Sequence, residues 1–110
     1  MKQGEIWELY LDPVKDGEQS GRRLAVIISG NLLNQKLQVV IVCPLTTSIK
    51  GYKGNVILEP DERNNLPKKS EILTFHIRSV SKLRLKKRIG NIQADQVKMV
   101  KSTLDDILRY

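Results

Sequence analysis

The sequence is poor in cysteine, histidine and aromatic residues, and each shortage excludes a class of protein. Cys43 is the only cysteine among 110 residues, so no internal disulfide can form. A single cysteine and a single histidine are also too few for a zinc site. Aromatic residues make up 5% of the chain, which argues against an extended platform for stacking bases. No apolar run approaches the roughly 20 residues of a membrane-spanning helix.

Other signals of metal, nucleotide or export chemistry are also missing. Asp61 and Glu62 lie in a predicted loop without partner carboxylates on a strand or helix, so a two-metal nuclease centre is not indicated. No glycine-rich loop of the nucleotide-binding type is present. Glu5, Glu8 and Asp12 are atypical of a secretory signal, which makes the cytoplasm the expected compartment. We therefore expect a protein that needs no cofactor and no metal.

Positive charge is the most prominent property of the composition. Nineteen Lys and Arg residues face twelve Asp and Glu residues, giving a net charge of +7. Such an excess favours a polyanionic partner, with nucleic acid as the first candidate and an acidic protein segment as the second. A solvated basic surface without a specific partner is the alternative, and charge alone does not decide between them.

The apolar residues form short runs separated by turn residues, as in an all-β domain. Strands are predicted at residues 5–11, 24–28, 37–45, 55–58 and 72–77, with a long exposed loop at 59–70. The run at 24–28 is almost entirely apolar, which predicts a strand buried on both faces. From residue 93 the apolar positions Val97, Val100, Leu104 and Ile107 follow the helical period. We therefore predict one domain spanning residues 1–110, a small curled sheet or barrel with a C-terminal helix.

Three polar segments interrupt the predicted strands or follow them directly. Glu18-Gln19-Ser20-Gly21-Arg22-Arg23 places two guanidinium groups beside a glycine, which suits a phosphate site as well as a solvated hairpin. Pro44-Leu45-Thr46-Thr47-Ser48 places three hydroxyl groups at the end of a buried strand, where an ordinary turn is the simpler interpretation. The third segment begins at Phe75-His76 and carries the basic side chains Arg78, Lys82 and Arg84, which suit contacts with a nucleic-acid backbone. Cys43 lies in the apolar run 39–43 and is predicted to be a buried structural thiol.

Together these segments resemble the MazF/PemK family of toxin endoribonucleases, in matching order over nearly the whole chain. The similarity rests on Gly4-Glu5-Ile6-Trp7, Asp12-Pro13, Glu18 to Arg23, Val26-Ile27-Ile28-Ser29, Cys43-Pro44-Leu45-Thr46-Thr47, Ile77-Arg78-Ser79-Val80, Lys82, Arg84-Leu85 and Lys87-Arg88-Ile89-Gly90. The resemblance implies an SH3-like barrel of the MazF/PemK–CcdB toxin type with a C-terminal α-helix. It also implies a homodimer, cleavage of single-stranded RNA, and inhibition by a cognate acidic antitoxin.

The resemblance also implies roles for individual residues. Arg23 matches the family's catalytic arginine, Thr46 its catalytic threonine, and Glu18 the acidic residue of the same loop. His76 occupies a position where the family often has a glutamine that contacts RNA. The residues expected to bind RNA are Gln19, Ser20, Arg22, Thr47, Ser48, His76, Arg78, Lys82 and Arg84. Three positions depart from the family pattern: Leu24 replaces a proline, Asp16 precedes Gly17-Glu18 where Gly-Ser-Glu is usual, and His76 replaces the glutamine.

The expected reaction uses the substrate's own 2′-hydroxyl as nucleophile and leaves a 2′,3′-cyclic phosphate and a 5′-hydroxyl. Arg23 and Thr46 would stabilise the anionic phosphorane, since a guanidinium is a strong donor but a poor base at neutral pH. Glu18 is the candidate base, with His76 in reserve. Two alternatives stay open: a barrel toxin that binds a protein target such as DNA gyrase without cleaving anything, and a catalytically weakened RNA-binding relative.

Overall fold

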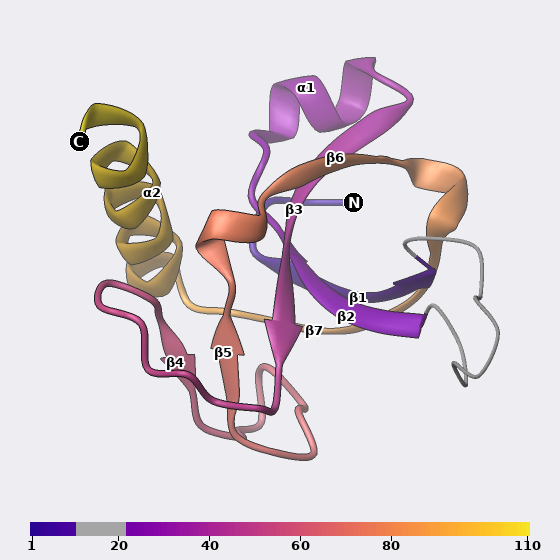
Figure 1. Ribbon diagram of the computed structural model, residues 1–110. Helices are drawn as coiled ribbons and strands as arrows, with labels where there is room; N and C mark the ends of the chain where they lie inside the picture. Colours follow the sequence, from indigo (N-terminus) through magenta and orange to yellow (C-terminus); the bar gives the residue numbers. More distant parts are fainter. Residues whose placement is uncertain (11–21) are drawn as a thin grey trace, which may run out of the picture.

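A computed structural model of the chain describes residues 1–10 and 22–110 (Figure 1). The strands are β1 (Glu5–Tyr10), β2 (Arg22–Ile27), β3 (Val39–Thr46), β4 (Ile57–Leu58), β5 (Ser70–Ile72), β6 (Arg78–Ser81) and β7 (Leu85–Asn91). The helices are α1 (Asn31–Lys36), α2 (Ala94–Arg109) and two single 3₁₀ turns, η1 (Thr74–His76) and η2 (Lys82–Arg84). The mainly β architecture with a C-terminal helix is therefore confirmed.

The strands form one antiparallel path in the order β4-β5-β3-β2-β1-β7, and β6 also pairs with β3. In Figure 1 the sheet curls so strongly that β1, β2, β6 and β7 surround a half-open barrel, while α2 stands at one side. Two register irregularities between β1 and β7 accompany this curl, as bulges increase local twist. The long strand β3 is central, because β2 lines one edge and β5 and β6 divide the other.

The predicted single strand at residues 72–77 is wrong, because the turn η1 divides it. β5 pairs with Leu45 and Thr46 at the end of β3, whereas β6 pairs with residues Val39 to Val42 at its start. Pro44 lies between the two pairing regions and has no N–H to donate to a ladder. Its carbonyl oxygen still accepts a hydrogen bond from the Leu73 N–H at 2.8 Å, immediately before η1. The 3₁₀ turn thus occupies the part of the β3 edge where a regular ladder is interrupted.

Helix α1 was not predicted from the sequence, which indicated only a break after the second strand. At six residues it is too short to be stable by propensity alone, so tertiary contacts must hold it. The buried side chain of Asn34 donates to the Ser29 carbonyl at 2.9 Å and also pairs with the Ser29 hydroxyl. That hydroxyl accepts from the Ile41 N–H at 3.0 Å, which joins the end of β2, α1 and β3.

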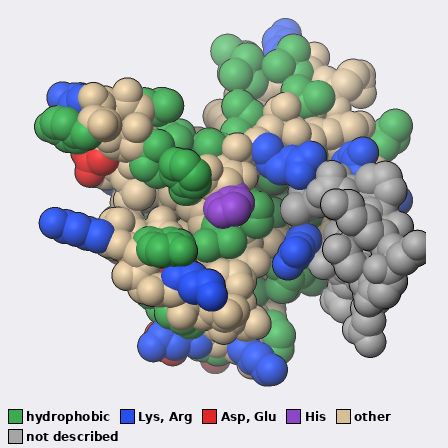
Figure 2. All heavy atoms as spheres, viewed as in Figure 1, with side chains coloured by type: hydrophobic (Ala, Val, Ile, Leu, Met, Phe, Trp, Pro, Cys, Tyr) green, Lys and Arg blue, Asp and Glu red, His purple; other side chains and the backbone are tan. Residues whose placement is uncertain are grey.

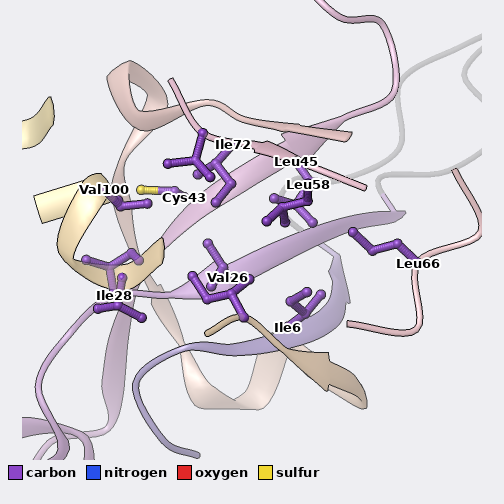
Figure 3. Packing of buried hydrophobic residues seen from close by; sticks show 12 residues of the cluster. Ile6, Val26, Ile28, Cys43, Leu45, Leu58, Leu66, Ile72 and Val100 are labelled. Carbon is purple, nitrogen blue, oxygen red and sulfur yellow. The ribbon is translucent and has the colours of Figure 1, made fainter. Parts of the chain in front are cut away.

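The core consists of two apolar clusters on the two faces of the curled sheet. Val26 belongs to the larger cluster, whereas its neighbours Ala25 and Ile27 belong to the smaller one, so β2 is buried on both faces as predicted. The larger cluster extends to Val100 of α2, and the thiol of Cys43 points toward that residue (Figure 3). Cys43 is fully buried, which confirms its interpretation as a structural residue.

Helix α2 begins with a capping box and packs through its first half. Gln93 precedes the helix, and its side chain and that of Gln96 exchange hydrogen bonds with each other's backbone N–H groups. Val97 and Val100 are buried against the sheet, but Ile107 is 36% exposed. The predicted apolar stripe is therefore buried mainly in the N-terminal half of the helix. No helix of the described residues is long and apolar enough to cross a membrane.

The segment predicted as an exposed loop, residues 59–70, is partly buried. Leu66 joins the larger core cluster, and the Asn64 side chain is almost fully enclosed. Its Oδ1 accepts hydrogen bonds from the backbone N–H groups of Asp61 and Leu66, both at 3.0 Å, and its Nδ2 donates to the Glu59 carbonyl at 2.8 Å. These hydrogen bonds fix the backbone of the loop around the buried Asn64 amide, which a buried apolar side chain could not do.

Candidate active site

The structure brings together Arg23 and Thr46, the two principal residues expected at the site. β2 and β3 are antiparallel with Ala25 opposite Pro44, and continuing this register by two residues places Arg23 beside Thr46. Both residues line a surface hollow of about 210 Å³ together with Leu24, Leu45, Thr47 and Ser70. Arg23 is exposed, and Thr46 is partly buried. A guanidinium and a hydroxyl thus share one open hollow in which an anion can reach both.

The Thr46 hydroxyl is held by the turn that follows its strand. Its Oγ1 accepts a hydrogen bond from the Ser48 N–H at 3.0 Å. Because a lone pair of the oxygen is used in this bond, the hydroxyl proton remains available for donation to a ligand oxygen. Thr47 lines the same hollow, and Ser48 is exposed beside it. Of the predicted run of three hydroxyl-bearing residues, Thr46 and Thr47 therefore line the hollow, and Ser48 contributes its backbone N–H to the turn.

Glu71 was not selected from the sequence, yet it is the pairing partner of Thr46 in β5. Its carboxylate is fully buried. One oxygen accepts from the N–H groups of Lys50 at 2.7 Å and Gly51 at 3.0 Å. The other accepts from the Tyr52 N–H at 3.1 Å and the Asn55 amide at 2.9 Å. Burial raises the pKa of Glu71, but these donors together lower the pKa below its ordinary value.

The loop between β3 and β4 is also tied to helix α2. The Thr103 hydroxyl donates to the Gly54 carbonyl and lies 3.1 Å from the Met99 carbonyl within its own helix. Gly54 has a positive φ of 89°, and a Cβ there would lie 3.3 Å from the Thr103 side chain. The loop is therefore held from the sheet by Glu71 and from the helix by Thr103.

His76, the reserve candidate for the base, lines a different hollow. This second hollow has a volume of about 510 Å³ and lies between the β3–β4 loop, η1 and α2. Its walls are mostly apolar and include Tyr52, Phe75 and Ile107. Figure 2 shows the histidine, in purple, at the surface between apolar side chains and basic ones. The structure does not place His76 in the hollow that Arg23 and Thr46 share.

The basic residues of the third segment are arranged around β6 and η2. Lys82 is engaged with the fold, since its ammonium donates to the Asn34 carbonyl in the last turn of α1. Arg84 donates to the Tyr10 carbonyl at 3.1 Å, at the end of β1. Arg78 is exposed on β6 and has an interaction partner within the chain. These cations therefore have structural contacts beside any role in binding a polyanion.

Several predicted site residues lie outside the described part of the chain. These are Glu18, Gln19 and Ser20, together with Asp16 of the same segment. Arg22 begins β2, but its side chain also lies outside the description. The one signal that could have revealed Glu71 is its place in an apolar strand, Ser70-Glu71-Ile72-Leu73, where a charge is costly unless it has partners. Among the described residues, no group of three or more His, Cys, Asp or Glu side chains is arranged to hold a metal.

A curled antiparallel barrel with a C-terminal helix, bearing an arginine and a threonine in one hollow, defines a small barrel protein with a candidate site for an anion. Residues 2–108 match the family described as PemK-like, MazF-like toxin of type II toxin-antitoxin system. The chain belongs to this family, and the resemblance noted from the motifs is confirmed.

Individual relatives agree with this assignment. The Endoribonuclease toxin MazF of Escherichia coli strain K12 is 26% identical over 106 residues, covering 96% of this chain and 91% of the relative. The crystal structure of MazF from Deinococcus radiodurans has a TM-score of 0.80 and 28% identity, covering 100% of this chain and 97% of that one. A MazE–MazF structure from the same organism has a TM-score of 0.81 and 26% identity, covering 98% of this chain and 95% of that one. The barrel-plus-helix fold of the MazF type is therefore confirmed.

Proposed function

We propose that this toxin is an endoribonuclease that cleaves single-stranded RNA by attack of the substrate's 2′-hydroxyl on the adjacent phosphorus. The observation that carries the proposal is the shared hollow of Arg23 and Thr46, two donors from neighbouring strands. Relatives over nearly the whole chain are named endoribonucleases, which supports the same reaction. The products would be a 2′,3′-cyclic phosphate and a 5′-hydroxyl, and DNA, lacking the nucleophile, would not be cleaved.

The chemistry divides between charge stabilisation and proton transfer. Arg23 donates charge-assisted hydrogen bonds to the non-bridging oxygens as the phosphorane forms, and Thr46 adds a neutral donor. Glu18 accepts the proton of the 2′-hydroxyl in this scheme. No step uses a metal ion or cofactor. The RNA on either side of the reacting phosphate is bound by polar and basic side chains: Gln19, Ser20, Arg22, Thr47, Ser48, Arg78, Lys82 and Arg84. His76 contacts a base or phosphate beside the second hollow.

We further propose that the toxin acts in the cytoplasm and is inhibited by an acidic antitoxin segment. A net charge of +7 favours such a segment, and a structural relative is a MazE–MazF complex. A disordered acidic segment that folds across the basic surface would cover the hollow and exclude RNA.

The test is cleavage of a long mixed-sequence RNA by the purified protein in EDTA. We expect discrete fragments that end in 2′,3′-cyclic phosphates, and no cleavage of DNA of the same sequence. RNA that is bound but left intact would identify a non-cleaving relative. A protein that neither binds nor cleaves RNA would favour a toxin with a protein target such as DNA gyrase. Activity that disappears in EDTA and returns with magnesium would contradict the metal-free scheme.

Substitutions at the hollow test the assignment of Arg23 and Thr46. Arg23→Ala and Thr46→Ala should each reduce single-turnover cleavage by about 10²–10³, the usual effect of losing one preorganised donor. Arg23→Ala should be the more severe, since a charged donor is stronger than a neutral one. Arg109→Ala is the matched control, because Arg109 is an exposed guanidinium at the end of α2 that pairs with Asp105 in its own helix. If Arg23→Ala cleaves like Arg109→Ala, Arg23 is not catalytic.

A further inference from the structure

The β3–β4 loop contains an anion-binding arrangement that the protein fills with its own side chain. The consecutive N–H groups of Lys50, Gly51 and Tyr52 all converge on the Glu71 carboxylate, at 2.7 to 3.1 Å. Gly51 has a positive φ of 69°, the left-handed conformation that lets successive N–H groups turn toward one point. Asn55 adds a fourth donor at 2.9 Å. A buried carboxylate with four donors fixes the loop strongly, because the charge of Glu71 would be costly to bury without those partners.

This arrangement begins two residues after the turn that holds Thr46. The Thr46 hydroxyl is oriented by the Ser48 N–H, and the Lys50 N–H is the first donor to Glu71. Thr46 and Glu71 are also directly opposite each other in the β3–β5 ladder, so their side chains lie on the same face of the sheet. The Glu71 carboxylate therefore binds the residues that follow the Thr46–Ser48 turn, and the backbone of Glu71 pairs with Thr46, where the turn begins.

The same geometry makes Glu71 unsuitable as a base. Both carboxylate oxygens are occupied by donors, and the hydrogen bonds lower its pKa despite burial. A carboxylate that is fully buried and already paired has no access to a substrate proton.

We propose that Glu71 is a positioning residue for cleavage: it fixes the loop so that the Thr46–Ser48 turn aims the Thr46 hydroxyl into the hollow shared with Arg23. This role rests on the proposed function, since Thr46 must act on a phosphate for its aim to matter. Glu71→Gln keeps the shape of the side chain but replaces one acceptor oxygen by an NH₂ group that faces N–H donors. The loop should then move, and misplacement of a donor by about 1 Å costs up to about 100-fold in rate.

A double-mutant cycle with Thr46→Ala separates this role from general stabilisation. Glu71→Gln should lower the single-turnover cleavage rate about 10- to 100-fold with little change in RNA affinity. In the Thr46→Ala background the same substitution should change the rate less than about twofold, because the group that it misaligns is already absent. Glu62→Gln, at an exposed glutamate, is the matched control and should cleave like the wild type. Equal losses in both backgrounds, or wild-type cleavage by Glu71→Gln, would overturn the proposal.

Hydrogen exchange gives a second readout that does not depend on RNA. In Glu71→Gln the amides of Ser48, Lys50, Gly51 and Tyr52 should exchange faster, while amides of the β2–β3 ladder keep wild-type protection. Uniform acceleration throughout the protein would mean a purely structural role and would overturn the proposal. If the wild type exchanges as expected but does not cleave RNA, the proposed function fails while the role of Glu71 in holding the loop stands.

Asn55→Ala keeps the proposal testable if Glu71→Gln does not fold. This substitution removes one of the four donors and leaves the carboxylate in place. It should reduce cleavage several-fold, and the reduction should again vanish in the Thr46→Ala background. A reduction that persists there would contradict a route through Thr46.

Discussion

At the scale of single residues, Cys43 and Glu71 show how neighbouring groups determine the pKa and charge state of a buried ionisable side chain. Cys43 lies among apolar side chains, and burial raises the pKa of its thiol to about 12. Glu71 is equally buried, but four donors converge on it, and its pKa is lowered. Burial opposes the charged form of both groups, so the difference comes from the hydrogen bonds. Cys43 therefore stays neutral in the folded protein, and Glu71 stays charged.

Glu71 should make the stability of the protein depend on acid pH. Its folded-state pKa lies below the ordinary value of 4.5, so its stabilising contribution is present above the unfolded pKa. That contribution is lost as the pH falls through the folded pKa. Glu71→Gln should therefore lower the free energy of unfolding at pH 7 by about 1–3 kcal/mol, and by less at pH ~3. Urea titrations at several pH values measure this, with Glu62→Gln as the control, and parallel curves for wild type and Glu71→Gln would contradict it.

Cys43 should be inert in the folded protein. A thiol with a pKa of about 12 is almost entirely protonated at pH 8, and the side chain is fully enclosed. A thiol-reactive dye should therefore label the native protein at a rate limited by unfolding, and label the urea-unfolded chain at once. Labelling of the native protein as fast as that of the unfolded chain would mean that the core around Val100 opens readily.

The residues of the site differ in how visible they are in the sequence. Arg23 and Thr46 lie in motifs whose order along the chain indicates the family, so the sequence alone identifies both as candidates. Glu71 has no motif, because its role depends on a loop some twenty residues away in sequence whose N–H groups meet only after folding. Backbone donors carry no residue type, so the sequence offers only the charge of Glu71 within an apolar segment and does not indicate which loop binds it.

At the scale of elements, the close contact between β7 and the loop after β4 depends on Gly90. A Cβ built on Gly90 would lie 2.3 Å from the Arg63 carbonyl oxygen and 2.7 Å from that of Asn64. The Asn91 N–H donates to that same Arg63 oxygen at 2.9 Å, and Asn65 donates to the Ile89 carbonyl at 3.0 Å. The loop thus adds its backbone to the β7 edge, and only a residue without a side chain fits there.

Gly90→Ala should destabilise the protein strongly. The added methyl would collide with backbone atoms, which cannot move aside like the end of a flexible side chain. We expect a loss of about 1–3 kcal/mol or more in the free energy of unfolding. Gly30→Ser is the control, because a Cβ there meets nothing within 4 Å, its φ is −66°, and serine is favourable at the N-cap of α1. It should change stability by less than about 0.5 kcal/mol, and similar values for the two variants would contradict the packing described here.

The elements that the sequence predicted poorly are those fixed by contacts between distant segments. The apolar runs of β1, β2 and β3 and the period of α2 are local patterns, and they were placed to within two residues. Helix α1 depends on the Ser29–Asn34 contacts, and the interruption of the strand at 72–77 depends on Pro44 in another strand. Neither dependence is expressed in the local periodicity of the segment itself.

At the scale of the whole molecule, the net charge of +7 should control binding of RNA. Each phosphate that the protein neutralises releases counterions, so affinity should fall steeply as salt rises from about 50 to 200 mM. Lys87→Ala, on an exposed residue of β7 outside the hollow, serves to measure the diffuse part of this effect. This substitution should weaken RNA binding slightly and leave the rate of RNA cleavage within the bound complex unchanged. Affinity that is independent of salt would show that phosphate contacts do not dominate.

The same scale governs assembly, and we expect the toxin to be a homodimer. A chain of 110 residues buries a modest core, and the two clusters here leave large apolar side chains at the surface. Leu32, Leu33, Leu37 and Val39 are between 39% and 68% exposed around α1, and Phe75 and Leu108 are more exposed still. Exposed apolar side chains in such number are typical of surfaces that another chain covers.

Sedimentation at micromolar concentration should give twice the 12.6 kDa of one chain. Leu33→Lys and Leu108→Lys, introduced separately, should identify the covered face, because only a charge buried at the contact would dissociate the dimer. A wild-type protein that sediments as a monomer over the whole concentration range would contradict the expectation.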